Sequence, residues 1–148
     1  MIWLYPALRA VLRVFLSPAC FLHTLLAMAS TFHVLIIDDE ENIRRALGRS
    51  LSKLGCVVNM AQTAERGLEL LDTERFDAVF AALCVRESGG RGVARFVKQH
   101  YPDTKVFLVT GWKGELEPSL LQNDGIHEVI HKPLSFSEIR DKVLEQLG

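Results

Sequence analysis

The chain has 148 residues, about the length of one domain, and 49% of its residues are hydrophobic, which is enough for a single core. Seventeen lysines and arginines nearly balance eighteen aspartates and glutamates, and the net charge of −1 gives no basic footprint for nucleic acid. The three cysteines lie far apart without a Cys-x-x-Cys pair, which excludes a disulfide framework and a zinc site. We therefore expect reduced thiols, a cytoplasmic protein and no nucleic-acid partner.

Residues 1–32 form an apolar extension that contains no acidic residue and only two arginines. Its stretch Val14–Ala29 is long enough for the core of a signal peptide but short for a membrane span of about 20 residues. Three interpretations stay open: a natural start at Met28 with everything upstream mis-assigned, a membrane anchor, or a cleaved signal. We accordingly divide the chain into this extension and a domain over 33–148, with membrane contact expected only if the extension is a true anchor.

The first predicted element of the domain is a strand at Val34–Ile37, an apolar run of the kind buried on both faces of a parallel sheet. A helix over Asn42–Leu54 follows, with apolar residues at helical spacing, and Gly55 is expected to end it in the left-handed conformation. Val57–Ala61 predicts the second strand. Thr63 then suits the N-cap of the next helix.

The third strand is predicted at Ala78–Leu83. After it, a glycine-rich loop over 88–92 is expected to lead into a helix that stops before Pro102. Lys105–Thr110 predicts the fourth strand, because it is again a short apolar run.

The last third of the domain begins with Pro118, which suits the first position of a short helix closed by Gly125. Glu128–His131 predicts the fifth strand. The final helix is expected to open with a capping box, Ser135-Phe-Ser-Glu138. Four of its residues are predicted to face the core: Ile139, Val143, Leu144 and Leu147.

Five strands that alternate with five helices predict a doubly wound parallel α/β sheet of the flavodoxin type, with helices on both faces. The expected strand order is 2-1-3-4-5, and such sheets bind ligands at the carboxyl ends of their strands. The residues that fall at those ends are Asp38, Asp39, Ala82, Thr110 and Lys132.

These motifs resemble the response-regulator receiver (CheY-like) family over about residues 33–148. The resemblance rests on four runs, which end in Asp38-Asp39, in Ala82-Leu83, in Val109-Thr110-Gly111 and in Ile130-His131-Lys132-Pro133. In that family, the residue in the place of Ala82 is the aspartate that receives a phosphoryl group. The alanine methyl group cannot act as a nucleophile.

The resemblance also implies roles for the other residues of the site. In receivers, the paired acids, here Asp38 and Asp39, help to hold Mg²⁺ together with a backbone carbonyl, here that of Cys84. The family's threonine hydroxyl and lysine ammonium, here Thr110 and Lys132, bind phosphoryl oxygens. Without a carboxylate at position 82, we expect magnesium binding to be weak or absent. We expect Asp38 and Asp39 to hold the lysine, and its bond to the next proline to be cis.

The chain departs from the family at two further positions. Val129 stands where receivers carry an aromatic residue that reports phosphorylation, and Arg86 stands in place of a proline. Two other acids are candidate acceptors, namely Asp77 at the opposite end of its strand and Glu87 in the following loop. Trp112 lies in the loop two residues after Thr110, where it suits simple packing over the loop, filling of the space that Val129 leaves, or anchoring of a partner.

The pattern predicts a stand-alone pseudo-receiver in two-component phosphorelay signalling, not an enzyme, since the chain ends with the helix that closes a receiver. Its expected partner is a histidine kinase or phosphotransfer protein, bound without acceptance of phosphate. Two alternatives stay open. One is an ordinary phosphoaccepting receiver in which an aspartate at position 82 has been changed to Ala82 or a nearby acid substitutes. The other is a magnesium-dependent phosphotransfer enzyme with Asp38 as its nucleophile.

Overall fold

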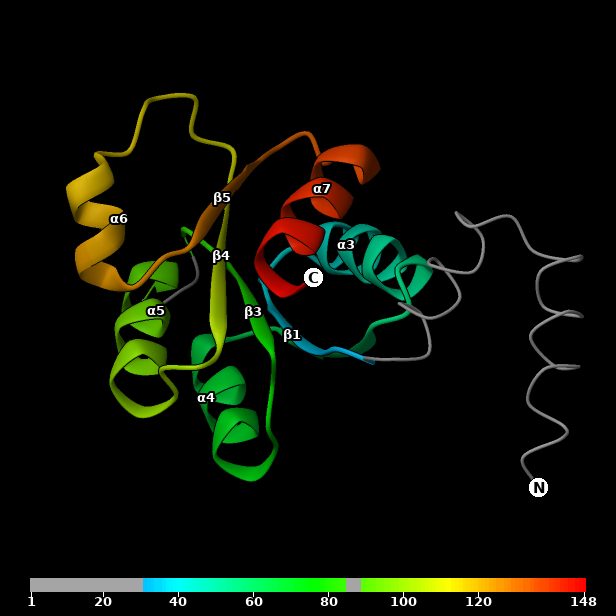
Figure 1. Ribbon diagram of the computed structural model, residues 1–148, viewed down its shortest axis with the longest axis horizontal. Helices are drawn as coiled ribbons and strands as arrows, with labels where there is room; N and C mark the ends of the chain where they lie inside the picture. The colour runs from blue at the N-terminus through cyan, green and yellow to red at the C-terminus, as the bar shows by residue number, and fades with distance from the viewer. Residues whose placement is uncertain (1–30, 85–88) are drawn as a thin grey trace, which may run out of the picture. The chain divides into compact units, whose positions relative to one another are not determined.

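The structure is a computed structural model that describes residues 31–84 and 89–148 (Figure 1). The strands are β1 (His33–Ile37), β2 (Val57–Ala61), β3 (Ala78–Ala82), β4 (Lys105–Thr110) and β5 (Glu128–His131). The helices are α3 (Glu41–Lys53), α4 (Ala64–Thr73), α5 (Gly89–His100), α6 (Pro118–Asp124) and α7 (Phe136–Leu147). Residues 1–30 of the apolar extension lie outside the described residues, so its three interpretations stay predictions. None of the described helices is long and apolar enough to cross a membrane.

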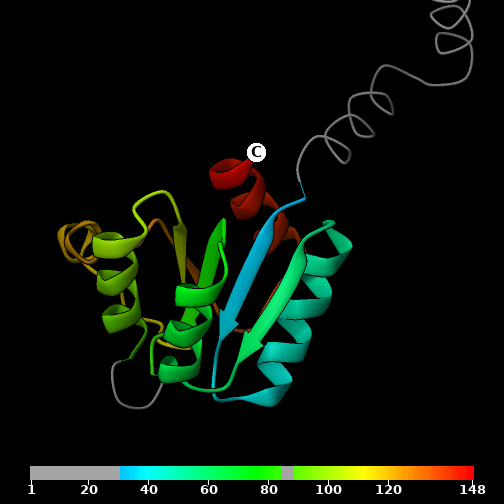
Figure 2. The ribbon, with the colours of Figure 1, turned by 90° about the horizontal axis from the view of Figure 1, so that it is seen from below.

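The five strands form one parallel sheet in the order β2-β1-β3-β4-β5, which confirms the predicted doubly wound fold. Figure 2 shows α3 and α7 on one face of the sheet and α4 and α5 on the other. This arrangement follows from right-handed crossovers between parallel strands, which place successive helices on opposite faces when the strand order reverses.

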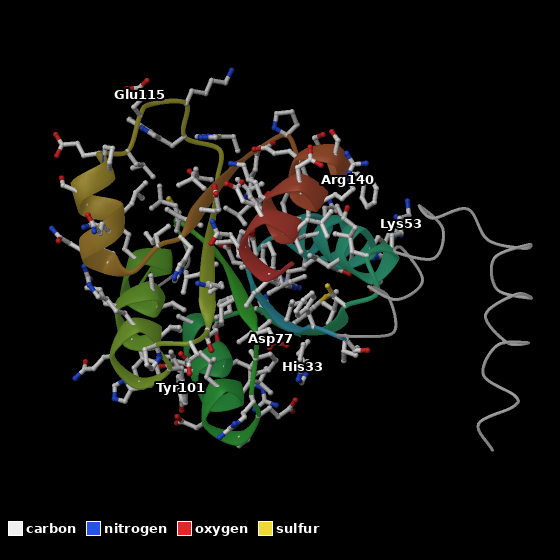
Figure 3. The ribbon with its side chains drawn as sticks, in the orientation of Figure 1. His33, Lys53, Asp77, Tyr101, Glu115 and Arg140 are labelled. Atoms are coloured by element: carbon white, nitrogen blue, oxygen red, sulfur yellow. The ribbon has the colours of Figure 1, made fainter. Side chains whose placement is uncertain are left out.

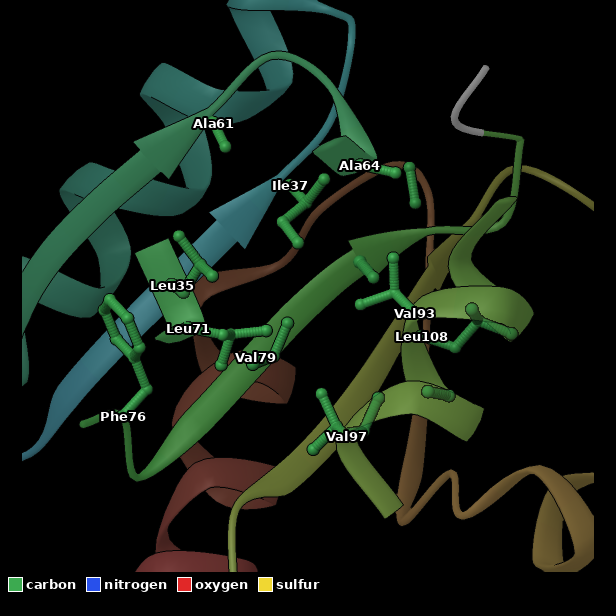
Figure 4. Close-up of a cluster of buried hydrophobic side chains, with 14 of the residues drawn as sticks. Leu35, Ile37, Ala61, Ala64, Leu71, Phe76, Val79, Val93, Val97 and Leu108 are labelled. Atoms are coloured by element: carbon green, nitrogen blue, oxygen red, sulfur yellow. The ribbon is translucent and has the colours of Figure 1, made fainter. Parts of the chain in front are cut away.

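Side chains of the central strands alternate between two apolar clusters, one on each face of the sheet. On one face, Leu35, Val79 and Leu108 pack under α4 and α5 (Figure 4). On the other face, Phe80 and Phe107 stack with ring centroids 4.5 Å apart beneath α3 and α7. All five residues of β3 are buried, so this strand lies at the centre of the domain.

Most predicted helix ends are confirmed by their local geometry. The Thr63 hydroxyl accepts a hydrogen bond from the backbone N–H of Arg66 at 3.2 Å, as an N-cap does. Gly55 and Gly125 follow their helices with φ of 84° and 77°, the left-handed conformation that glycine adopts without a steric penalty.

The predicted glycine-rich loop over 88–92 is wrong from Gly89 onward, because α5 already begins there. A Cβ atom at Gly90 would clash with the carbonyl oxygen of Ala82 and would lie 2.7 Å from a methyl carbon of Leu108. Glycine at this position therefore lets the first turn of α5 pack directly onto the end of β3, which is a packing requirement and not a sign of a flexible loop.

The predicted capping box at the start of α7 is also wrong. Ser135 occupies the N-cap position but makes no side-chain cap hydrogen bond, and its hydroxyl instead bonds that of Ser137 at 2.9 Å. The Glu138 carboxylate lies 3.5 Å from Lys142 one turn further on. The prediction that Leu144 of α7 faces the core is also wrong, because this residue is 53% exposed.

A cluster of charged residues, which we call the α5–α6 clamp, ties these two helices together. The buried Asp124 carboxylate of α6 accepts hydrogen bonds from Arg91 at 2.6 Å and from Arg95 at 3.3 Å. Lys98 of α5 donates to the carbonyl oxygens of Gln122 and Asn123 at the end of α6. These bonds satisfy carbonyl groups that a helix C-terminus otherwise leaves unpaired.

Candidate functional site

The register of the sheet brings the predicted site residues to one edge. Ile37 of β1 pairs with Ala81 of β3, and Ala82 pairs with Val109 of β4. The carboxyl ends of β1, β3, β4 and β5 therefore lie at a common level, and four of the predicted site residues stand at or just beyond these ends. They are Asp38, Ala82, Thr110 and Lys132.

Asp38 is the most deeply placed acid of this edge, with an exposed fraction of 1%. Its Oδ1 accepts a hydrogen bond from the backbone N–H of Glu40 at 2.9 Å, whereas its Oδ2 has no hydrogen-bond partner. Burial raises the pKa of this carboxyl, and the hydrogen bond from Glu40 and the charge of Lys132 only partly oppose that effect. Arg44 donates to the Asp38 carbonyl oxygen at 2.7 Å and so fixes the start of α3 against the site.

The Lys132 ammonium is held by two carboxylates. Its Nζ donates to Oε1 of Glu40 at 3.0 Å and lies 3.6 Å from Oδ2 of Asp38. The predicted pairing with Lys132 is thus confirmed for Asp38 and wrong for Asp39. Asp39 is exposed, and Glu40 pairs with the lysine in its stead. Glu40 belongs to the acidic run after β1, which is visible in the sequence. Its contact with Lys132, 92 residues further on, is seen only in the folded chain.

The two carboxylates also determine the pKa of Lys132. Burial lowers this pKa, but the hydrogen bond to Glu40 and the negative charge of Asp38 outweigh the burial, so that the pKa is raised overall. The lysine therefore stays charged. The peptide bond between Lys132 and Pro133 is cis, as predicted.

Thr110 ends β4 with its side chain buried. Its hydroxyl oxygen accepts a hydrogen bond from the backbone N–H of Trp112 at 3.0 Å, and its carbonyl oxygen accepts one from the N–H of Lys132 at 2.8 Å. The Trp112 ring is 62% exposed and packs over Gly114, and the Trp112 carbonyl oxygen accepts a hydrogen bond from His131 at 3.2 Å. The loop after β4 is thus attached to the site by hydrogen bonds from the Trp112 backbone to the side chains of Thr110 and His131.

Ala82 is the last residue of β3, is 5% exposed and belongs to the apolar cluster under α4 and α5, so its side chain brings no polar atom to this edge. Cys84, two residues further on, is exposed, and Val129 is half-buried against the apolar cluster under α4 and α5. The predicted departure Arg86 and the candidate acceptor Glu87 lie outside the described residues.

Asp77 lies at the opposite edge of the sheet, as predicted. It precedes the first residue of β3, and its Oδ2 accepts a hydrogen bond from the backbone N–H of His33 at 2.7 Å. Figure 3 shows these two residues side by side. Asp77 therefore holds the start of β1 and is separated from Lys132 by the full length of β3.

Two further features bear on ligand binding. Within 31–84 and 89–148, no group of three or more histidine, cysteine, aspartate or glutamate residues is placed to hold a metal ion. A hollow of about 650 Å³ lies at the far edge of the sheet, where Asp72 accepts a hydrogen bond from the Tyr101 hydroxyl at 2.8 Å. This hollow is remote from Asp38 and Lys132, so its size does not make it part of the site.

Strand order, helix placement and the acid–lysine edge together define a CheY-like signalling domain. The profile of the response regulator receiver domain family matches residues 34–144, and the chain belongs to this family. It is thus a response-regulator receiver domain of two-component signalling.

Individual relatives agree with this assignment. The response regulator protein PilR of Pseudomonas aeruginosa is 26% identical over 114 residues, which cover 76% of this chain and 25% of PilR. A CheY-like receiver domain from Methanospirillum hungatei has a TM-score of 0.73 and 28% identity over 80% of this chain and 94% of its own. The response regulator TrrA of Thermotoga maritima, in complex with Mg²⁺-BeF, has a TM-score of 0.72 and 25% identity, covering 79% of this chain and all of TrrA.

The similarity to curated relatives is confined to part of their length. The chain spans 25% of PilR, 44% of a probable transcriptional regulator of Cyanidium caldarium and 46% of the response regulator MprA of Mycolicibacterium vanbaalenii. The shared portion is therefore the receiver domain, and the activities of those whole proteins are not part of the assignment.

Proposed function

We propose that this receiver domain signals without accepting a phosphoryl group, by contact with a histidine kinase or phosphotransfer protein. The observation that carries the proposal is the position of Ala82, which ends the central strand beside Asp38 and one register step before Thr110. In the receiver family this is the place of the acceptor aspartate. A methyl group has no lone pair with which to attack phosphorus, so the nucleophile of the family reaction is missing.

Two of the described acids, Asp77 and Asp38, are poorly placed to replace the acceptor, which supports the proposal. Asp77 lies at the opposite edge and is hydrogen-bonded to His33. Asp38 is buried and lies 3.6 Å from Lys132, so its carboxylate is engaged with the ammonium group. A nucleophilic role for Asp38, as in the phosphotransfer-enzyme alternative, would require it to leave this pairing.

The contact between Lys132 and Glu40 gives independent support. In the family, the lysine binds the phosphoryl group once it has been transferred. Here its ammonium already donates to Glu40 at 3.0 Å and is close to Asp38, so an incoming phosphoryl group would have to displace a carboxylate. Val129 in place of an aromatic reporter agrees with a domain in which the phosphorylation switch is no longer used.

We also propose that Asp38, Asp39 and the Cys84 carbonyl form at best a weak magnesium site. Magnesium requires several oxygen ligands in octahedral geometry, and TrrA provides an example of a receiver with Mg²⁺-BeF bound. Within residues 31–84 and 89–148, the buried side-chain oxygen without a hydrogen-bond partner is Oδ2 of Asp38, and the Lys132 ammonium lies 3.6 Å from it. Titration calorimetry should show much tighter magnesium binding for Ala82→Asp than for the native chain, and equal affinities would refute the weak site.

The main test of the proposal is intact-mass analysis of the full chain after incubation with Mg²⁺ and an acyl phosphate donor. Ala82→Asp, treated in parallel, provides a carboxylate that would attack phosphorus, form an aspartyl phosphate and release the donor's carboxylate. We expect the mass of the native chain to remain unchanged. A phosphoryl adduct on the native chain would show that another residue is the acceptor, and the proposal would be wrong.

Partner binding is tested separately with purified histidine kinases and phosphotransfer proteins from the source organism. We expect the native chain to bind one of them with the same affinity whether or not a phosphodonor is present. Failure to bind any of them would contradict the proposed partner class, and an affinity that changes on addition of the donor would contradict phosphorylation independence.

A further inference from the structure

The outer edge of β2 carries unpaired backbone groups. In the described sheet β2 pairs only with β1, and it lies at one side of the sheet beside α3 (Figure 2). The N–H of Val57 and the carbonyl of Ala61 bond toward β1. Because successive residues of a strand direct these groups to opposite sides, the N–H and C=O groups of Val58 and Met60 point outward.

This edge has none of the features that usually prevent strand addition. Proteins commonly protect an edge strand with charged residues, proline or a bulge. The sequence of β2, Val57-Val-Asn-Met-Ala61, contains no charge and no proline, and its pairing with β1 is continuous over all five residues. Val57 and Met60 are 49% and 44% exposed. Among the described residues none pairs with the outer side of β2, so the strand presents an apolar edge for pairing.

A groove of about 480 Å³ lies beside this edge and is lined by five residues of α3 and by Met60 of β2. Met60 forms its apolar floor, and its side chain occupies the space that a larger residue at Gly48 would need. The residues that line the groove are Arg45, Gly48, Arg49, Ser52, Lys53 and Met60. We call this the β2–α3 groove.

The helical side of the groove is strongly basic. Arg45, Arg49 and Lys53 lie four residues apart along α3 and therefore form a row with a spacing of about 6 Å. Only Arg45 has an acidic partner, Glu41 at 3.7 Å. Among the described carboxylates, none forms an ion pair with Arg49 or with Lys53. The ammonium of Lys53, the residue labelled at the end of α3 in Figure 3, lies 5.6 Å from the ring centroid of Phe136, the first residue of α7.

We propose that the β2–α3 groove binds an acidic segment of a partner protein in extended conformation, which adds to the sheet as a strand beside β2. Alternate residues of such a strand are about 6.8 Å apart on one face, close to the spacing of the basic row, so successive acidic side chains can each meet a cation. The backbone of the segment takes up the outward groups of Val58 and Met60. Its pairing is independent of the phosphorylation chemistry at Ala82.

Two other occupants fit less well. A membrane surface would meet the cations, but a bilayer offers no strand to pair with the backbone of β2. A second copy of this chain that paired through its own β2 would bring Val57–Ala61, which contains no carboxylate, to the basic row. Of these three occupants, only an acidic extended segment both pairs with the backbone groups of β2 and neutralises the cations of α3.

The test uses the full chain and a fluorescent eight-residue peptide that alternates glutamate with valine, with binding measured by fluorescence anisotropy. The double variant Arg49→Glu, Lys53→Glu should bind at least about tenfold more weakly than the native chain. The control Arg75→Glu, Lys113→Glu has the same change of net charge on exposed residues outside the groove and should bind like the native chain. Equal loss in both variants would reduce the interaction to nonspecific attraction and overturn the proposal.

Two altered peptides separate charge from strand pairing. Replacing every glutamate by glutamine removes the charge, and N-methylation of alternate amides removes the donors needed for pairing with β2. Both changes should weaken binding by about tenfold or more. Undiminished binding of the N-methylated peptide would overturn the strand addition. Binding of the full chain to phosphatidylserine vesicles, with no binding of the peptide, would overturn the peptide partner in favour of a membrane surface.

Discussion

Glu40 and Lys132 are 92 residues apart in the sequence, yet Oε1 of the one accepts a hydrogen bond from Nζ of the other at 3.0 Å. Glu40 thereby supplies a negative charge to the lysine, which Ala82, with only a methyl group, cannot do. The pair explains how a lysine stays partly buried and charged at this edge, since Asp38 alone lies farther away, at 3.6 Å.

Removal of this partner should lower the pKa of Lys132. The pKa is raised because the hydrogen bond to Glu40 and the charges of Asp38 and Glu40 outweigh burial, so Glu40→Gln leaves burial opposed mainly by Asp38. The measurement is an NMR titration of the lysine side-chain signals at alkaline pH. Glu41→Gln is the matched control, because Glu41 pairs with Arg45. A Lys132 titration that is unchanged by Glu40→Gln would contradict this account of the site.

Asp38 should make stability depend on pH in the acidic range. Burial raises its folded-state pKa above the ordinary value of 3.8, so the folded protein takes up a proton at a pH where the unfolded chain does not. Above the raised pKa, the buried negative charge therefore lowers the free energy of unfolding by its whole amount. This destabilisation disappears as the pH falls through the raised pKa toward 3.8. The native chain should gain stability relative to Asp38→Asn as the pH falls through this window.

The measurement for Asp38 is urea unfolding of both proteins from neutral pH to pH 4. At neutral pH we expect Asp38→Asn to be more stable by roughly 1 kcal/mol, because Lys132 keeps Glu40 as its partner when the buried charge is removed. A difference between the two proteins that stays constant with pH would show that Asp38 does not titrate as described.

A side chain at Gly90 should destabilise the domain. Its Cβ would clash with the Ala82 carbonyl oxygen and lie 2.7 Å from Leu108, so Gly90→Ala is expected to cost about 2–3 kcal/mol through overpacking. Gly111→Ala is the control, since a Cβ there lies 4.0 Å from its nearest neighbour, Lys132. Chemical denaturation should show a large loss for the first variant alone, and equal losses would rule out steric contact with β3 as the cause.

The two helix N-caps should differ in their contribution to stability. Thr63→Ala removes the hydrogen bond to Arg66 and should cost about 1 kcal/mol in thermal or urea unfolding. Ser135→Ala removes no cap hydrogen bond and should cost a few tenths of that amount. Similar losses for the two variants would mean that Ser135 caps α7 in solution after all.

The fold followed closely from sequence because its determinants are local. Five apolar runs predicted the strands, Thr63 and Gly125 predicted helix ends, and the order of elements predicted the sheet topology. The errors arose where a local motif was overridden by packing. Gly90 reads as part of a loop but permits close approach of α5 to β3, and Glu138 completes a capping motif but lies instead beside Lys142.

The site was predictable only to the level of strand ends. Position along each strand brought Asp38, Thr110 and Lys132 to one edge, since their place depends on register alone. That Glu40 and not Asp39 pairs with Lys132 depends on how the chain passes from β1 into α3. There the Glu40 N–H donates to the Asp38 carboxylate, and Arg44 donates to the Asp38 carbonyl oxygen. Side-chain direction after a strand is not encoded in a simple periodicity.

The α5–α6 clamp has a mechanical consequence for the segment between β4 and α6. Because two guanidinium groups bond the Asp124 carboxylate and Lys98 bonds the carbonyls at the end of α6, we expect the two helices to shift together. A rearrangement that began at Thr110 would then have to be absorbed by the backbone of residues 111–117, and it would first have to break the hydrogen bonds that tie Trp112 to Thr110 and His131.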